Sequence, residues 1–233
     1  MTRFESIVSK YGLRPIMITG RAGTGKTTAT KRLVEELNIK AYFLDNCVFG
    51  FYEKFRDKMK ELTGTYPDFE CPNFDLVNFH AECVGKDAET YINVITELRE
   101  YMMEQFCDEL ERTYGTARQS GTGMTTLALA YEPAPRKTFL MDCFTPGFDI
   151  LKTCKKIYRL LSPEQLTANA VGKRENLSGE KLERLMNSVN LATDMTLNTD
   201  LLGMEFVDIE NDHTQECMDN IVARIASDLR PIF

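Results

Sequence analysis

Short apolar runs alternate with longer amphipathic stretches along this chain, a pattern that predicts strands and helices in turn. The runs that predict buried strands are 15–20, 39–46, 137–144, 158–162 and 204–211. Most of these runs are continuously apolar, which is typical of strands that are covered on both faces. Strands that alternate with helices predict a parallel sheet with right-handed crossovers, and hence a three-layer α/β domain.

Helices are predicted between the strands, where apolar residues are spaced three and four apart. The predicted helices are 26–38, 49–64, 87–115, 147–158, 162–170, 178–190 and 212–229. Ser162 is the expected N-cap of one helix, with Pro163 at its first position, and Ser178 is the expected N-cap of the next. Residues 116–136 are polar and rich in glycine, and their pattern leaves open a loop with a helix or with a strand.

The stretch "GRAGTGKT" lies between the first strand and the first of these helices, and it matches the phosphate-binding pattern G-x-x-x-x-G-K-[ST]. Glycines let the backbone approach phosphate oxygens and turn its N–H groups inward, and the following helix adds the positive end of its dipole. Lys26 would reach the β- and γ-phosphates of ATP, and the Thr27 hydroxyl would hold Mg²⁺. The predicted nucleotide-binding residues are Gly20, Arg21, Ala22, Gly23, Thr24, Gly25, Lys26, Thr27 and Thr28.

Two aspartates follow predicted strands and become candidates for the same site. Asp142 closes "FLMD" and Asp45 closes "FLD". In a parallel sheet the carboxyl ends of the strands form the ligand face, so both carboxylates should converge on the glycine loop. Asp142 would hold Mg²⁺ with Thr27, and Asp45 could orient or deprotonate an attacking hydroxyl. The alternative is structural, with Asp142 in a cap or turn and Asp45 in a turn with Asn46.

A basic loop is predicted inside "SPEQLTANAVGKRENLSGEKLERLM", at residues 172–176 between two helices. Lys173 and Arg174 in this loop could neutralise the charge of a moving phosphoryl group, as the lid of a kinase does. The alternative is an ordinary helix hairpin with solvated charges. The predicted organisation is a phosphate-binding core in two halves, 1–64 and 136–233, with a lid near 165–180 and a helical, substrate-binding insertion at 65–135.

With these features the chain resembles the P-loop kinases of the nucleotide and polynucleotide kinase group, including phage deoxynucleotide, polynucleotide and 5-hydroxymethyluracil DNA kinases. The resemblance rests on "ITGRAGTGKTT", "FLDN", "FLMD", "LLSPEQL…GKREN…SGEKLERL" and the closing "FVDIENDHTQECMDNIVARI". It implies a three-layer P-loop kinase fold, ATP and Mg²⁺ as cofactors, and Asp45 as the base that acts on an acceptor hydroxyl. Such kinases often carry two spaced arginines in the lid, whereas Lys173 and Arg174 are adjacent. The resemblance does not extend over 65–135.

The sequence is compatible with two classes of phosphoryl acceptor. A hydroxyl on a nucleotide or on DNA would need a base such as Asp45. A deoxynucleoside monophosphate would need arginines to clamp its phosphate, and Arg99, Arg118 and Arg136 are candidates. In both cases the expected partner is a nucleotide or nucleic acid.

A small AAA+ or helicase-loader ATPase is the rival class, because "GRAGTGKTT" also looks like the phosphate loop of such motors. These motors typically have a Glu after the strand-end Asp to polarise water, and here Cys143 follows Asp142. A chain of 233 residues also leaves little room for the second domain of a helicase. A nucleotide-binding regulator without catalysis is a third possibility.

Composition and charge indicate where the protein is expected to be located and what kind of ligand it could bind. No apolar run approaches the roughly 18 residues of a membrane span, so no membrane association is expected and the cytoplasm is the expected location, that of the host if the protein is viral. The net charge is −7, yet residues 1–40 and 136–184 are each net basic. A polyanionic ligand held between these two segments would explain that distribution, as would chance variation among helix surfaces.

Overall fold

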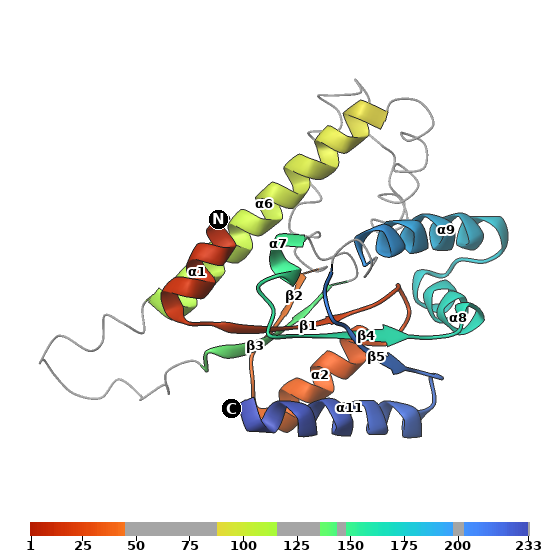
Figure 1. The fold of residues 1–233 in the computed structure, drawn as a ribbon. Coiled ribbons are helices and arrows are strands. Elements are labelled where there is room, and N and C mark those ends of the chain that lie inside the picture. The colour runs from red at the N-terminus through yellow and green to blue at the C-terminus, as the bar shows by residue number, and fades with distance from the viewer. Residues whose placement is uncertain (45–87, 116–135, 144–147, 198–202, 233) are drawn as a thin grey trace, which may run out of the picture.

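The structure is a computed structural model that describes residues 1–44, 88–115, 136–143, 148–197 and 203–232 (Figure 1). Several predictions fall outside these residues, among them the helix at 49–64, Asp45 and Arg118. The division into a core, an insertion and a lid stays a prediction.

The described residues form a five-stranded sheet in the order β2-β3-β1-β4-β5, in which every neighbouring pair is parallel. The strands are β1 (Arg14–Thr19), β2 (Ala41–Phe43), β3 (Thr138–Asp142), β4 (Lys156–Leu161) and β5 (Val207–Glu210). The predicted α/β class with a central parallel sheet is therefore confirmed. Because β1 lies in the middle of the order, the loop after this strand opens at the centre of the carboxyl edge.

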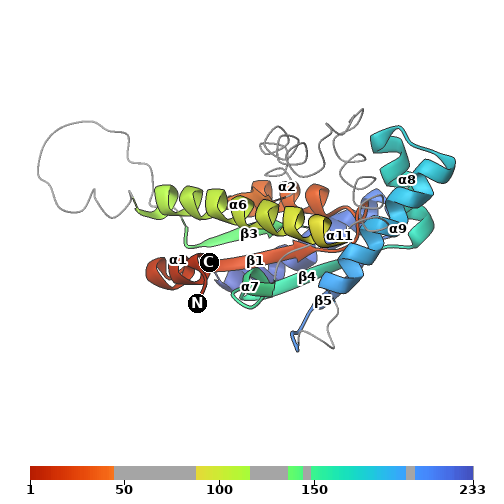
Figure 2. The same ribbon diagram turned by 90° about the horizontal axis from the view of Figure 1, so that it is seen from above.

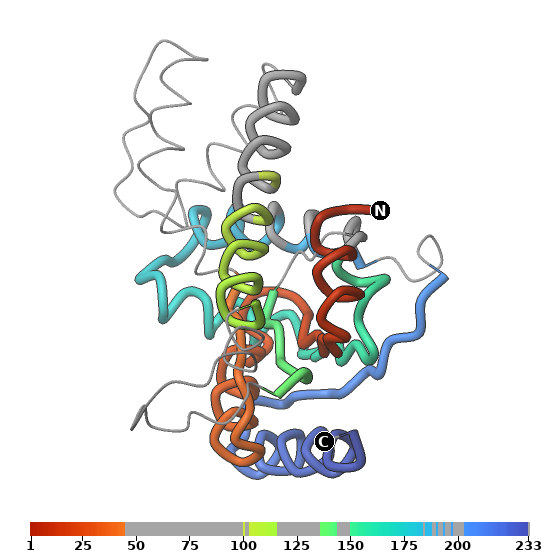
Figure 3. Tube along the Cα trace, turned by 90° about the vertical axis from the view of Figure 1, so that its left-hand side faces the viewer, coloured from red at the N-terminus to blue at the C-terminus, as the bar shows by residue number. Residues whose placement is uncertain are grey.

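Helices cover both faces of the sheet (Figures 1 and 3). They are α1 (Arg3–Tyr11), α2 (Lys26–Leu37), α6 (Ala88–Gly115), α7 (Phe148–Leu151), α8 (Glu164–Glu175), α9 (Gly179–Thr196) and α11 (Gln215–Leu229), with a 3-10 turn (Arg230–Ile232) at the end. Helices α2 and α11 lie on one face and α1, α6 and α7 on the other. Figure 2 shows α8 and α9 together at one end of the sheet, with α1 at the other.

Strand β1 contributes side chains to two separate hydrophobic clusters, one on each face of the sheet. Ile16 and Ile18 are buried in a cluster with α2 and α11, whereas Met17 is buried in a second cluster with α1 and α6. All three side chains are fully buried, because successive residues of a strand point to opposite faces and both faces are covered. The continuous apolar run in the sequence results from this arrangement.

Helix α1 was not expected from the sequence, although a signal for it was present. Thr2 and Glu5 form a capping box, in which the Thr2 hydroxyl accepts from the Glu5 N–H and the Glu5 carboxylate accepts from the Thr2 N–H. Gly12 ends the helix in the left-handed conformation. The apolar face of α1, with Phe4 and Ile7, is buried against the sheet.

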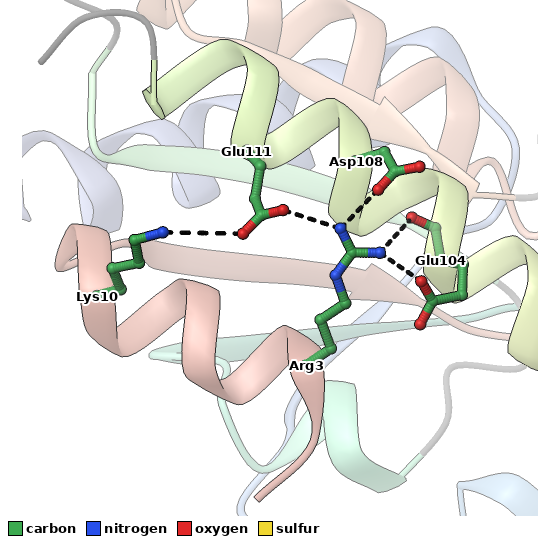
Figure 4. Close-up of polar contacts among 5 residues, drawn as sticks. All are labelled: Arg3, Lys10, Glu104, Asp108 and Glu111. Carbon is green, nitrogen blue, oxygen red and sulfur yellow. Dashed lines mark hydrogen bonds and ion pairs between the residues drawn. The ribbon is translucent and has the colours of Figure 1, made fainter. Parts of the chain in front are cut away.

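One ion-pair network joins α1 to α6 (Figure 4). The Arg3 guanidinium contacts Glu104, Asp108 at 2.5 Å and Glu111 at 2.8 Å, three carboxylates spaced along one side of α6. Lys10 adds a longer contact to Glu111 at 3.9 Å. These contacts fix the second half of α6 to the amino-terminal helix.

Several predicted boundaries were wrong, and those around β4 and α8 matter most for the site. The predicted helix at 147–158 is only α7, because Ile157 pairs with Met17 of β1 and belongs to β4. Helix α8 begins at Glu164 with Pro163 as its N-cap, so Ser162 does not cap it. The Ser162 hydroxyl is buried without a hydrogen-bond partner in the described part of the chain. Helix α8 also runs on to Glu175.

Candidate functional site

The phosphate-loop motif forms the turn between β1 and α2, as its sequence predicted. Gly20, Gly23 and Gly25 have φ angles of 139°, 80° and 88°, a region that side chains other than glycine rarely adopt. Gly25 is the N-cap of α2, so the open N–H groups of that helix face the loop. The glycines of the motif are therefore required by the backbone conformation.

The same glycines are also required by close packing. A Cβ on Gly20 would lie 2.3 Å from the Leu160 carbonyl oxygen, at the end of β4. A Cβ on Gly23 would lie 2.7 Å from the Thr167 carbonyl oxygen, on α8. The loop is thus supported from outside by neighbouring elements, and its conformation is set before any ligand arrives.

Lys26 is the first residue of α2, and its side chain reaches back across the loop. Its ammonium group donates to the Arg21 carbonyl at 3.0 Å, and the Thr24 hydroxyl donates to the same oxygen at 2.9 Å. The Lys26 residue is only 6% exposed, so its charge acts in a poorly hydrated environment, where electrostatic interactions are stronger. This arrangement holds a positive charge inside the loop.

Asp142 lies beside this charge. It is the last residue of β3 and pairs with Ile18 of β1, directly before the loop. The residue is 1% exposed, and apart from the nearby Thr27 hydroxyl its carboxylate oxygens have no hydrogen-bond partner within the described residues. Burial raises the pKa of Asp142, while the Lys26 ammonium and the nearby Thr27 hydroxyl partly oppose that rise.

A buried carboxylate that the protein leaves unsatisfied fits a divalent cation. Mg²⁺ binds oxygen ligands and commonly uses one or two carboxylates, with water and substrate phosphates completing its shell. Asp142 and the exposed hydroxyl residue Thr27 supply such oxygens at one place. The donor set therefore fits Mg²⁺ bound with a nucleotide.

The strand that precedes the second aspartate lies beside the site. Strand β2 pairs with β3, and Phe43 lies opposite Asp142. Asp45 itself lies outside the described residues, two positions beyond Phe43. Its convergence on the site stays a prediction.

The predicted basic loop has a different structure from the one expected. Lys173 and Arg174 lie in the last turn of α8, and Asn176 ends the helix with a φ of 55°. Both residues are exposed, and the Arg174 Nε donates to Glu175 at 2.6 Å. The helix ends at Asn176 and not before Lys173, because Asn, like Gly, tolerates the left-handed conformation that ends a helix.

Helix α8 contacts the phosphate loop through its middle rather than through its basic end. Val171 is buried with Leu185 and Met186 of α9, and Ala22 packs against this small cluster. The Arg21 side chain lies 3.6 Å from Glu164, at the start of α8. The α8–α9 pair is therefore docked on the loop, with an apolar contact and an ion pair.

Of the three arginines considered for a monophosphate clamp, Arg136 does not belong to the site. Its guanidinium donates to the carbonyl of Leu37 at 2.9 Å, at the far end of α2. The twelve residues of α2 place that point about 16 Å from the phosphate loop. The side chain of Arg99 and all of Arg118 lie outside the described part of the chain.

Asn211 is a residue of the site that the sequence did not single out. It directly follows β5 and is 2% exposed, and its side-chain Nδ2 donates to the Thr24 carbonyl at 2.9 Å. Like Asp142, Asn211 stands at the end of a strand, but β5 reads VDIE and lacks the continuous apolar run that pointed to Asp142. Nothing in the local sequence indicated that Asn211 would reach Thr24.

Comparison with known proteins supports the fold. No family model matches the chain, and no curated protein matches it significantly. Among solved structures, TT1252 from Thermus thermophilus is 15% identical over 93% of this chain and 98% of its own, with a TM-score of 0.58. A dephospho-CoA kinase from Campylobacter jejuni is 12% identical over 93% of this chain and 97% of its own, with a TM-score of 0.47. A shikimate kinase from Bacteroides thetaiotaomicron is 14% identical over 93% and 98%, with a TM-score of 0.43. At these identities the likeness concerns the fold alone.

No helix within the described residues is long and apolar enough to cross a membrane.

Proposed function

We propose that this chain is an ATP-dependent kinase that transfers the γ-phosphoryl group to a hydroxyl of a nucleotide or of DNA. The observation that carries the proposal is the buried carboxylate of Asp142, which lies beside Lys26 and the Thr27 hydroxyl at the phosphate loop and has no other hydrogen-bond partner within the described residues. Burying a carboxylate is costly even beside an ammonium group, and a bound cation would offset that cost. Magnesium bound with ATP is the ligand whose chemistry fits.

Each residue of the loop has a role in this proposal. The inward N–H groups and Lys26 would neutralise charge on the phosphate oxygens, the largest contribution expected in phosphoryl transfer. Thr27 and Asp142 would hold Mg²⁺, which would supply positive charge to offset the charge of the phosphates. Lys173 and Arg174 are exposed at the end of α8 and would act on the phosphates only if α8 moved.

Transfer rather than hydrolysis is favoured by the residue next to Asp142. Cys143 is buried, at 6% exposure, and its side chain offers no carboxylate to polarise a water molecule. An ATPase that drives motion needs such a group, and Cys143 occupies its usual place. The acceptor hydroxyl would then be activated by Asp45, which lies just beyond the strand paired with that of Asp142.

The test is incubation with γ-labelled ATP, Mg²⁺ and separate acceptors: deoxynucleosides, deoxynucleoside monophosphates, 5′-hydroxyl oligonucleotides and hydroxymethylated DNA. Label on a nucleoside, on a 5′-hydroxyl or on a hydroxymethyl group supports the proposal. Label on the phosphate of a monophosphate supports the alternative of a monophosphate kinase. Label released only as free phosphate, and more so with DNA, overturns both in favour of a motor ATPase.

Two variants show whether any activity belongs to this site. Lys26→Ala should lower transfer by about 100-fold or more, because it removes a charge that stabilises the transition state. Lys155→Ala makes the same change at an exposed position directly before β4, at the opposite edge of the sheet, and should retain most of the activity. Asp45→Asn should lower kcat by about 100-fold for a hydroxyl acceptor, the effect of a lost general base.

A further inference from the structure

Asn211 is held at its position by the sheet. Its backbone N–H donates to the Leu161 carbonyl at 2.7 Å, which continues the pairing of β4 and β5 by one residue. The next turn contains His213 at a φ of 66° and leads to Thr214, the N-cap of α11. This turn lies at the end of the sheet that also carries α8 (Figure 1).

Both the amide nitrogen and the amide oxygen of the Asn211 side chain form hydrogen bonds, and these bonds are possible in only one orientation of the amide. The Nδ2 donates to the Thr24 carbonyl at 2.9 Å, and the Oδ1 accepts from the His213 N–H at 3.0 Å. A flipped amide would set two acceptors against each other at Thr24 and two donors against each other at His213. The hydrogen-bond network therefore fixes the orientation of the amide.

The contact at Thr24 determines how the next peptide is turned. In a planar trans peptide the carbonyl and the following N–H point in opposite directions. Because the Thr24 carbonyl points at Asn211, the N–H of Gly25 points away from it. A Cβ on Gly25 would lie only 2.8 Å from the Asn211 Nδ2, so the amide is packed directly against this peptide.

We propose that Asn211 is a positioning residue for the phosphate loop, which holds the Thr24–Gly25 peptide so that the Gly25 N–H is presented to a bound phosphate. The residue acts from the far end of the chain, 187 positions from Thr24, and touches the loop rather than the ligand. The inference rests on the proposed phosphate site, although it does not depend on which acceptor is phosphorylated.

The test uses Asn211→Asp at pH 8, because a high pH favours the ionised form of the introduced carboxyl group. This variant keeps the size of the side chain but replaces the donor with an oxygen that faces the Thr24 carbonyl. Asn220→Asp is the matched control, because it makes the same change at an exposed position of α11. The affinities for MgATP, adenosine and inorganic pyrophosphate are measured by calorimetry, and amide hydrogen exchange is followed across residues 22–27.

Asn211→Asp should weaken MgATP and pyrophosphate by about 10- to 100-fold, the range expected when a buried hydrogen bond is lost and its acceptor is left unpaired. Exchange of the Gly25 and Lys26 amides should rise, and Asn220→Asp should change neither quantity by more than about 2-fold, as expected of a surface change. Loss of affinity for ATP and adenosine with pyrophosphate unchanged would overturn the proposal, because Asn211 would then act on the base.

Unchanged affinities and unchanged exchange would also overturn it. If the Asp variant does not fold, Asn211→Ser gives the same test, because its shorter side chain cannot span the distance to Thr24. If the wild type binds MgATP but transfers no phosphoryl group, the proposed kinase activity fails and this inference stands. If the wild type binds no phosphate ligand, the proposed function fails, and hydrogen exchange alone decides whether Asn211 holds the loop.

Discussion

Replacing Asp142 with asparagine should stabilise the ligand-free protein and at the same time abolish transfer. Asp142 is 1% exposed, and apart from the nearby Thr27 hydroxyl its oxygens have no hydrogen-bond partner within the described residues. A buried polar group left unsatisfied costs about 1–3 kcal/mol, and more when it is charged. An amide carries no net charge, so the variant removes part of this cost.

The expected gain at pH 8 is about 1–2 kcal/mol in the free energy of unfolding, since Lys26 already offsets some of the cost of the charge. For a domain of this size that corresponds to roughly 2–4 °C in Tm for each kcal/mol. Urea titration followed by circular dichroism measures the free energy, and calorimetry measures the Tm.

The pH dependence has a definite sign. Because burial raises the pKa of Asp142 above its value in the unfolded chain, the folded state binds this proton more tightly. The cost of the ionised group is complete above the folded-state pKa and disappears as the pH falls through it. The difference in stability between the variant and the wild type should therefore be largest at pH 8 and shrink towards acid pH.

Asp208→Asn provides a control with the opposite sign. The Asp208 carboxylate accepts two hydrogen bonds from Arg159, at 2.8 and 2.7 Å, so its loss should destabilise the protein by up to about 1 kcal/mol. MgATP should raise the Tm of the wild type by mass action but not that of Asp142→Asn. An Asp142→Asn variant less stable than the wild type at pH 8 without ligand would refute the reasoning, because the carboxylate would then be satisfied in the folded protein.

Two further predictions concern stability alone. Arg3→Ala should lower the free energy of unfolding by about 1 kcal/mol at low salt and by less in 1 M NaCl, because a partly exposed network on α6 is screened by ions; urea titrations at the two salt concentrations check this, and an effect independent of salt would contradict it. The Lys156 ammonium lowers the pKa of Asp228, 3.0 Å away, so this carboxylate adds stability above the pKa of the unfolded chain that is lost as the pH falls through its folded-state pKa. Asp228→Asn should therefore be less stable than the wild type at pH 7, the difference should shrink as the pH falls through the folded-state pKa, and a difference that does not change with pH would count against the assignment.

Some of this protein is determined by local sequence. The conformation of "GRAGTGKT" needs glycine at three positions, so composition and spacing alone predicted the loop and the start of α2. Continuous apolar runs likewise predicted the strands of a doubly covered sheet. The capping box at Thr2 and Glu5 was equally local, and α1 could have been predicted from it.

The boundaries of some other helices and strands were not determined by the local sequence. The start of β4 could not be read from the sequence, because Ile157 and Tyr158 are both buried and adjacent apolar residues fit a helix as well as a strand. The end of α8 was misplaced because Lys173, Arg174 and the nearby asparagine have the composition of a loop. Only the pairing with β1 and the packing against the phosphate loop decide these cases.

The sequence by itself determined the conformation of the glycine loop between β1 and α2, since that conformation depends on neighbouring residues and on their allowed φ angles. The tertiary structure decided which side chains surround the loop, because side chains far apart in the chain meet only after the strands have been ordered. The pairing of β3 with β1 brings Asp142 beside Lys26, and the placement of β5 brings Asn211 to Thr24. Neither contact produces a periodic pattern in the local sequence. The contact between Asn211 and Thr24 therefore could not be predicted from the sequence alone.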